Sequence, residues 1–384
     1  MRGFVDGSVA VLLPAYLLAL GHGEFEVGVI GSVTLAGSAL ATLALGAFGH
    51  RAAARTLLLG ASLLMAATGL GFAAFSAWWP LLVIAFIGTL NPGAGDVSVF
   101  LPLEHARLAA AGGSGTERTA LFARYSLAGA LSAALGSLFT AVPAWLAAHA
   151  AIGRVDALRS VFLLYAAIGV LIWWLYHRLP RSDAAATAVR AAPLGPSRAI
   201  VVKLAALFAV DSFAGGLVLN SLVSLWLMQR FGLTIEQAGL FFFCTGLLAA
   251  ASQLAAPWLA QRIGLVNTMV FTHLPANVCL IAAALVPTLP LALALLGVRA
   301  LLSQMDVPTR TAFVMSVVTP AERTAAASFT AVPRSLASAA SPALAGALMA
   351  SGAWATPLVL CGALKIAYDL TLWWACRGQA LQEG

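Results

Sequence analysis

The sequence predicts an all-α membrane protein with twelve transmembrane helices in two pseudo-symmetric six-helix bundles. Three observations lead to this fold class. Of the 384 residues, 61% are apolar and only 9% are charged, whereas a soluble domain carries about 25% charged residues. The apolar residues form continuous runs of about 20, the length that a helix needs to cross a bilayer. Finally, matching residues recur in the same order in the two halves of the chain.

This composition excludes several classes of protein. A water-soluble enzyme, a disordered chain and a nucleic-acid-binding protein all need more charge than the 21 basic and 14 acidic residues present. The scattered histidines form no catalytic group, the four cysteines have no metal-ligand spacing, and no phosphate-binding loop for ATP occurs. We therefore expect no enzymatic activity, no cofactor and no nucleic-acid partner.

Each predicted helix is an apolar run that ends where charges, Gly/Pro pairs or polar clusters interrupt it. Continuous apolarity without alternation at every second residue favours helices over a membrane β-barrel. In chain order, the interruptions fall at residues 21–26, 49–55, 77–79, 104–118, 148–158, 177–198, 229–235, 261–264, 287–289, 319–323 and 351–353. The predicted spans are therefore 3–20, 27–48, 56–76, 80–103, 119–147, 159–176, 199–228, 236–260, 265–286, 290–318, 324–350 and 354–376.

The longest polar stretch follows the sixth predicted helix and divides six helices from six. It predicts an N-terminal bundle at 1–178, a cytoplasmic central loop at 179–198 and a C-terminal bundle at 199–384. Most basic residues in loops lie on the side of the termini and the central loop, whereas the opposite side holds Arg154, Arg159 and Arg230. Because basic residues collect on the cytoplasmic side, we expect both termini in the cytoplasm and a multi-pass protein of the bacterial inner (cytoplasmic) membrane.

The two halves also share an ordered series of residues. Asp96 precedes Glu-Arg-Thr-Ala at 117–120, and Asp306 precedes the same four residues at 322–325. Further pairs at similar offsets are Asp6 with Asp211, Arg51 with Arg262, Gly21 with Gly232 and Gly28 with Gly239. Two bundles of like orientation imply a pseudo-two-fold axis along the membrane normal and a central cavity, which is typical of secondary transporters.

Two loop motifs make the chain resemble the major facilitator superfamily over essentially its whole length. That family has Gly-x-Leu-Ala-Asp-Arg-x-Gly-Arg-Arg between helices 2 and 3, and residues 46–55 read Gly-Ala-Phe-Gly-His-Arg-Ala-Ala-Ala-Arg. A second copy, Pro-Trp-Leu-Ala-Gln-Arg-Ile-Gly, occupies residues 257–264, and the Glu-Arg-Thr-Ala segments resemble the family's Glu-Arg-Gly loops. The resemblance implies transport by alternating access, with helices 1, 4, 7 and 10 lining the cavity.

Ionisable residues inside predicted helices are candidate functional residues, because an unpaired charge there costs several kcal/mol. Asp211, Arg299, Arg334 and Lys365 fall near the middle of the membrane at 1.5 Å per residue. Asp211 either pairs with Arg299 or Arg334 to join helices, or carries a proton coupled to substrate movement. The surplus of cations hints at an anionic substrate, although Lys365 on the twelfth helix is expected at the lipid or bundle edge.

A second group of charges lies in the cytoplasmic third of the predicted helices: Asp6, Asp96, Asp306, Arg124 and Arg310. The carboxylates are expected to pair with Arg124, Arg310 and the loop residues Arg51 and Arg262, latching the two halves together when the protein opens outward. Alternatively, Asp306 and Arg310, one turn apart, neutralise each other.

A further candidate is Asn91, in the segment Asn-Pro-Gly-Ala-Gly at 91–95. A proline with two glycines interrupts the backbone hydrogen bonds of a membrane helix, and such breaks mark sites or hinges in transporters. Pro308 predicts a similar kink in the tenth helix.

Together these observations predict a secondary active transporter that moves a small molecule across the inner membrane by alternating access. Short loops resemble those of drug and metabolite antiporters, so proton-coupled export is the leading prediction. The alternative is proton-coupled uptake of a small organic anion. The expected partners are the substrate, protons and the lipid bilayer, and we expect a monomer.

Overall fold

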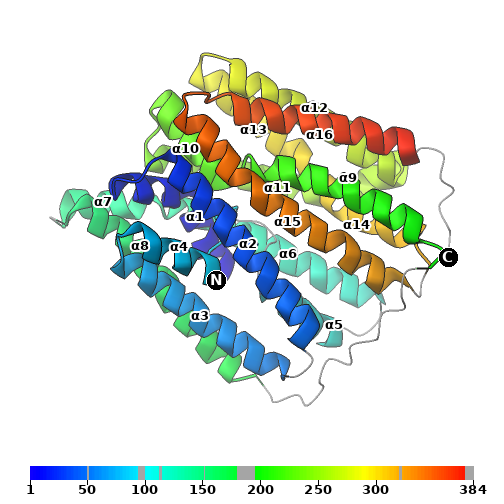
Figure 1. Ribbon diagram of the computed structural model, residues 1–384, viewed down its shortest axis with the longest axis horizontal. Coiled ribbons are helices and arrows are strands. Elements are labelled where there is room, and N and C mark those ends of the chain that lie inside the picture. Colours follow the sequence, from blue (N-terminus) through cyan, green and yellow to red (C-terminus); the bar gives the residue numbers. More distant parts are fainter. Residues whose placement is uncertain are drawn as a thin grey trace. The chain divides into compact units, whose positions relative to one another are not determined.

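The computed structural model describes residues 1–49, 52–93, 100–111, 115–150, 152–179, 195–319 and 322–376 (Figure 1). All regular secondary structure in these ranges is helical. Ten stretches of the described residues are long and apolar enough to cross a membrane, and α4 is a shorter apolar helix. The predicted all-α membrane fold is confirmed.

Every predicted span overlaps one helix or two consecutive helices, although most of α5 lies beyond the predicted end of the fourth span at residue 103. The single helices are α1 (Arg2–Ala19), α2 (Glu24–Phe48), α3 (Ala54–Ala74), α8 (Arg154–His177), α11 (Ile235–Ile263), α12 (Leu265–Leu285), α15 (Arg323–Ala350) and α16 (Thr356–Cys376). The divided spans are α4 (Trp78–Ile87) with α5 (Phe100–Ala111), α6 (Gly115–Leu138) with α7 (Ala141–His149), α9 (Arg198–Gly216) with α10 (Asn220–Phe231), and α13 (Leu289–Ser303) with α14 (Asp306–Val317).

Proline and glycine account for the divided spans. Pro102, Pro143 and Pro308 each occupy the third position of the helix that follows a break, in α5, α7 and α14. Proline has no N–H to donate and its ring excludes the preceding helical carbonyl, so it is tolerated in a first turn but ends an incoming helix. The break between α9 and α10 follows Gly215 and Gly216 instead.

The chain forms two compact units. Unit 1 consists of Met1–Ala188 with Leu219–Phe243, and unit 2 consists of Val189–Val218 with Cys244–Gly384. Helix α10 and the start of α11 thus belong to unit 1. The bundle boundary predicted at 179–198 stays a prediction, because residues 180–194 lie outside the described ranges.

Helix packing inside each unit follows the internal repeat. In unit 1, α1 packs on α6 and α3 on α8, which are the first helix on the fifth and the third on the sixth. In unit 2, α9 packs on α15 and α12 on α16, the corresponding helices of the second half. Figure 1 shows these pairs side by side, with α9 beside α15 and α16 beside α12. The repeated residues therefore reflect a repeated packing scheme.

Small residues allow the repeated pairs to approach closely. A Cβ atom on Gly7 of α1 would overlap the backbone of Ala133 in α6, and one on Gly136 would overlap the backbone of Phe4. The hydroxyl of Ser8 donates a hydrogen bond to the Gly136 carbonyl at 2.5 Å. Lipid is as apolar as the side chains, so membrane helices associate through such close packing and hydrogen bonds.

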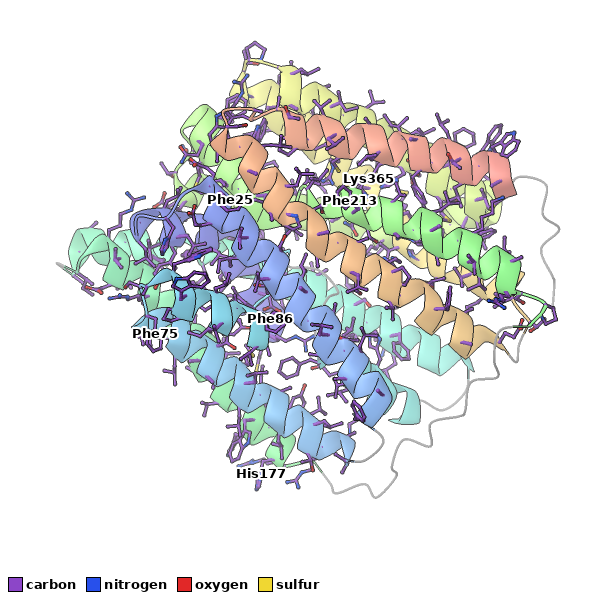
Figure 2. All side chains as sticks on the ribbon, viewed as in Figure 1. Phe25, Phe75, Phe86, His177, Phe213 and Lys365 are labelled. Atoms are coloured by element: carbon purple, nitrogen blue, oxygen red, sulfur yellow. The ribbon has the colours of Figure 1, made fainter. Side chains whose placement is uncertain are left out.

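The outer helix faces carry large apolar side chains, seen projecting around the ribbon in Figure 2. Leu63, Val83, Leu254, Val278 and Leu285 are each between 54% and 63% exposed. A water-soluble protein rarely exposes so many large apolar side chains, whereas a helix surrounded by lipid does so without cost. The exposed surface thus agrees with a membrane-embedded chain.

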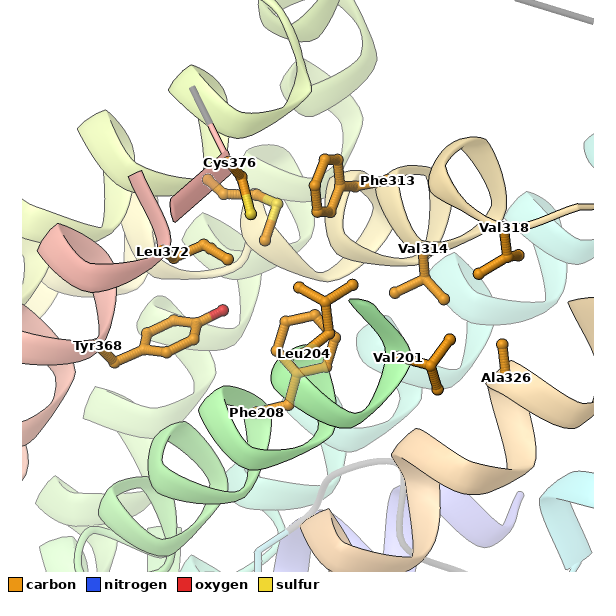
Figure 3. Packing of buried hydrophobic residues seen from close by; sticks show 11 residues of the cluster. Val201, Leu204, Phe208, Phe313, Val314, Val318, Ala326, Tyr368, Leu372 and Cys376 are labelled. Atoms are coloured by element: carbon orange, nitrogen blue, oxygen red, sulfur yellow. The ribbon is translucent and has the colours of Figure 1, made fainter. Parts of the chain in front are cut away.

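A buried apolar cluster fills the interior of unit 2 (Figure 3). Its residues come from α9, α12, α14, α15 and α16, and include Val201, Phe208, Phe313, Ala326 and Leu372. The ring of Tyr368 packs edge-on to Phe208, with 6.4 Å between ring centroids. This cluster holds α9, α14 and α16 together beside the charged residues described next.

Candidate functional site

Asp211 of α9 lies in a buried group of charged residues in unit 2. Nη1 of Arg310 donates to Oδ2 of Asp211 at 3.1 Å, and Nζ of Lys365 donates to Oδ1 at 2.5 Å. Asp306 accepts a second hydrogen bond from Arg310. These four residues, called the Asp211 cluster below, are 4% to 8% exposed and carry two positive and two negative formal charges. Such balance makes buried charges tolerable in a membrane helix.

Three helices supply the Asp211 cluster. Asp306 is the first residue of α14, where free backbone N–H groups and the helix dipole favour a carboxylate. Arg310 follows one turn later, and its guanidinium carbon lies 5.6 Å from the centre of the Phe208 ring on α9, a cation–π geometry. Lys365 comes from α16 and is labelled in Figure 2. The predicted mutual neutralisation of Asp306 and Arg310 is confirmed.

The predicted partners of Asp211 are wrong. Nε of Arg334 donates to the Ser212 hydroxyl at 3.3 Å, and Nε of Arg299 is buried without a hydrogen-bond partner. Within the described part of the chain, neither arginine makes an ion pair. Depth along the tenth span does not show which face of the helix a residue occupies, and α14 presents Arg310 to Asp211 instead.

The expected position of Lys365 at the lipid or bundle edge is also wrong. Its side chain is buried, because α16 packs against both α9 and α12. Sequence position gives the order of helices but not the rotation of each about its axis, which decides whether a residue faces lipid or protein.

A second buried group on α12 and α16 was not predicted. Nδ1 of His273 lies 3.0 Å from Oδ1 of Asp369, and Nδ2 of Asn277 donates to Oδ2 of the same carboxylate at 3.3 Å. The three residues are 1% to 4% exposed. A signal was present in the sequence, since His273 and Asn277 are one turn apart, as are Lys365 and Asp369.

In unit 1, Asp6 has a partner on its own helix. Nε of Arg2 lies 3.9 Å from Oδ2 of Asp6, and Nη1 of Arg2 donates to Glu104 of α5 at 3.2 Å. Glu104 also accepts hydrogen bonds from the hydroxyls of Tyr125 and Tyr176, which lie on α6 and α8. Glu104 is a residue that the sequence reasoning missed, and it joins α5 to three other helices of the unit.

The predicted latch between the halves stays a prediction. Arg51 and Asp96 lie outside the described residues. Arg124 is exposed, and the guanidinium carbon of exposed Arg262 stacks 4.1 Å from the centre of the Trp258 ring. Asp306 is already neutralised by Arg310 of its own helix.

Asn91 lies at a true helix break, as predicted. Helix α4 ends at Ile87, and Oδ1 of buried Asn91 accepts a hydrogen bond from the Gly93 backbone at 3.3 Å. The Pro92 carbonyl accepts from the backbone N–H of Ser221 in α10 at 3.1 Å. This bond pairs one free backbone group of each interrupted span, and in lipid such groups need partners within the protein. A role of Asn91 in binding stays a prediction.

The glutamate of the second Glu-Arg-Thr-Ala segment anchors the start of α9. Glu322 accepts hydrogen bonds from the backbone N–H groups of Gly195 and Ser197, the latter at 3.2 Å, and from the Thr319 hydroxyl at 2.8 Å. Hydrogen bonds from Ser197, Gly195 and Thr319 favour the carboxylate and lower the pKa of Glu322 to about 2. The anchor therefore stays charged throughout the physiological pH range.

Comparison with known proteins gives the family. A family model of the Major Facilitator Superfamily matches residues 1–303 and, in a second match, residues 204–379. The uncharacterized membrane protein YJR124C of Saccharomyces cerevisiae is 23% identical over 396 aligned positions, which cover 94% of this chain and 88% of the yeast protein.

Several solved transporters share the fold. The nucleoside transporter NupG aligns with a TM-score of 0.73 at 15% identity, covering 99% of this chain and 98% of NupG. A bacterial homologue of the human lysosomal transporter Spinster aligns with a TM-score of 0.73 at 16% identity, covering 98% of this chain and 94% of the homologue. The human organic anion transporter MFSD10 aligns with a TM-score of 0.65 at 20% identity, covering 97% of each chain.

The family match extends over nearly the whole chain, and the solved transporters share its fold over nearly the whole chain as well. The expectation of a multi-pass membrane transporter rather than an enzyme is confirmed. The chain belongs to the Major Facilitator Superfamily.

Proposed function

We propose that the chain is a proton-coupled secondary transporter that exports a small molecule, and that Asp211 binds the coupled proton. The observation that carries this proposal is the position of Asp211. Its two carboxylate oxygens are bound by cations from two other helices, Arg310 of α14 and Lys365 of α16. A change in the charge of this one carboxylate therefore acts on three helices at once.

The coupling follows from the energetics of buried ion pairs. While Asp211 is charged, it holds Arg310 and Lys365 against α9. A proton on Asp211 leaves Lys365 without a carboxylate partner and leaves Arg310 with Asp306 alone. A buried cation without its counter-ion is strongly unfavourable, so the helices rearrange until Lys365 finds water or another anion. Proton binding is thereby linked to a change of conformation.

Export is proposed as the direction because the short loops resemble those of drug and metabolite antiporters. We also propose the bacterial inner membrane as the location, cytoplasmic termini and a monomeric state. Uptake of a small organic anion is the second candidate. Arg299 and Arg334 support it, since among the described residues neither forms an ion pair with a carboxylate.

Flux into proteoliposomes with an imposed pH gradient tests the proposal. Suitable probes are a nucleoside and an organic anion, the classes named for two of the similar transporters, together with a lipophilic cationic drug. Export by antiport moves the probe against the direction of proton flow, whereas symport moves it with the protons. We expect a pH gradient to drive uphill movement of at least one probe.

The matched variants are Asp211→Asn and Asp156→Asn, since Asp156 is an exposed aspartate at the start of α8. We expect Asp211→Asn to lose pH-driven uphill transport while still exchanging labelled for unlabelled probe, and Asp156→Asn to behave like the wild type. Uphill transport that persists in Asp211→Asn would remove Asp211 from the coupling role.

A further inference from the structure

We propose that His273 and Asp369 form a second proton-binding site, coupled through Lys365 to Asp211. This inference rests on the proposed function and extends it from one titratable carboxylate to two linked sites. It is carried by charge balance and by geometry in unit 2.

The ion-paired residues of unit 2 are not balanced without an added proton. Asp211, Asp306 and Asp369 supply three negative charges, and the fixed cations that contact them, Arg310 and Lys365, supply two. The remaining partner is His273, which is positive only when protonated. This ion-paired set is neutral when His273 and Asp369 together hold one extra proton. Arg299 and Arg334 also belong to unit 2 but lie outside the set, since among the described residues neither pairs with a carboxylate.

The geometry around Asp369 suits a proton that comes and goes. The amide Nδ2 of Asn277 donates to Oδ2 of Asp369, and this oxygen accepts the bond equally well when the extra proton lies on His273. The contact between Oδ1 and Nδ1 of His273, at 3.0 Å, accommodates either an imidazole with a carboxylate or an imidazolium with a carboxylate. The pair thus gains one proton and changes from a net charge of −1 to zero without breaking a hydrogen bond.

The charged surroundings of His273 come from the helices that pack against α12, and from α9 and α15, which pack against α16. The ionisable residues with described side chains on these helices are Cys361, Lys365, Tyr368, Asp369 and Cys376 on α16, Arg299 on α13, Asp306 and Arg310 on α14, Arg198, Lys203 and Asp211 on α9, and Arg334 on α15.

Lys365 connects the two sites. It binds Asp211, and it lies one turn from Asp369 on the same helix, the spacing at which side chains of a helix are neighbours. One ammonium group cannot fully neutralise two carboxylates. A proton on Asp211 therefore turns Lys365 toward Asp369, and a proton on the His273–Asp369 pair leaves Lys365 with Asp211. The proton occupancy of each site depends on that of the other.

Nuclear magnetic resonance of the full chain in lipid nanodiscs, with ¹⁵N-labelled histidine, tests this inference with the proton as the only ligand. The chain has 6 histidines, and His273→Gln identifies the resonance by its loss, with exposed His149→Gln as the matched control. We expect the His273 resonance to titrate between pH 5 and 9. We also expect its midpoint to move by about 0.5 pH unit or more in Asp211→Asn and in Lys365→Gln, in opposite directions, because the two changes remove charges of opposite sign.

Two results would overturn the inference: a His273 resonance that does not change between pH 5 and 9, or a midpoint that is the same in the wild type and in both variants. If one variant does not fold, the other supplies the test. The titration requires neither substrate nor a gradient. If a pH gradient drives no flux but the His273 midpoint shifts in the variants, only the proposed function is contradicted. If a pH gradient drives flux but His273 shows no coupled titration, only the second site is contradicted.

Discussion

Lys365 illustrates, at the scale of single residues, how the role of a charge depends on its partner. A lysine in the twelfth helix is expected to face lipid or the bundle edge, yet its ammonium lies 2.5 Å from Asp211. Asp369 was likewise overlooked although aspartate is rare in membrane helices, and Glu104 was overlooked because it lies just beyond the predicted span 80–103. Residue type and depth show which charges are costly, but only contacts show which of them neutralise one another.

Charge balance in the Asp211 cluster predicts how its variants behave. Lys365→Met leaves a surplus negative charge in the cluster. Removing one partner of a buried ion pair lowers the free energy of unfolding by about 3–5 kcal/mol. We expect the low end of that range, because Asp211 keeps Arg310. The double variant Lys365→Met/Asp211→Asn removes one charge of each sign and should recover most of the loss.

Thermal unfolding in detergent measures this prediction, with exposed Arg262→Met as the control for loss of a cation. A double variant that is less stable than Lys365→Met would show that the cluster is not held by charge balance.

At the scale of helices, apolar length predicts where spans lie, and the positions of proline and glycine predict where they break. The break at Asn91 was anticipated because proline and glycine occur together there. The break before α14 was expected only as a kink at Pro308, since sequence does not show whether a proline bends a helix or begins a new one. Pro257 and Pro275, for example, lie inside continuous helices.

The contact between α1 and α6 predicts different effects for two glycine substitutions. A methyl group at Gly7 meets the backbone of Ala133, which cannot move without separating the helices. We expect Gly7→Ala to lose about 1–3 kcal/mol of stability, the usual cost of overpacking. Gly60→Ala in α3 meets nothing within 4 Å, so it should be neutral or stabilising by up to about 1 kcal/mol. Thermal unfolding of both variants checks this, and equal melting temperatures would contradict the close approach of α1 and α6.

At the scale of the whole molecule, the fold is shared with transporters that are only 15–20% identical. Such sharing is physically reasonable, because lipid demands apolar outer faces and saturated backbone hydrogen bonds, and many sequences meet these demands. Close helix packing constrains only a few small residues. The fold therefore does not determine which substrate is transported, and substrate specificity depends on individual side chains.

The asymmetry of basic residues predicts the orientation of the whole molecule. We expect green fluorescent protein fused after Gly384 to fluoresce and alkaline phosphatase fused there to be inactive, because both termini are predicted to be cytoplasmic. Fusions after Gly153 should give the opposite pattern, since Arg154, Arg159 and Arg230 are the few basic residues of the other side. The reverse result at both sites would show that loop charge does not set the topology of this chain.

The sequence alone determined the class of protein, the helix positions, the internal repeat and the family resemblance. These properties follow from composition, from the length of apolar runs and from residue order, which a linear chain displays directly. Only the tertiary structure showed that Asp211 pairs with Arg310 and Lys365, and that His273, Asn277 and Asp369 meet between α12 and α16. Those contacts depend on the rotation of each helix about its axis and on which helices are neighbours. Both are set by the packing of residues that are distant in sequence.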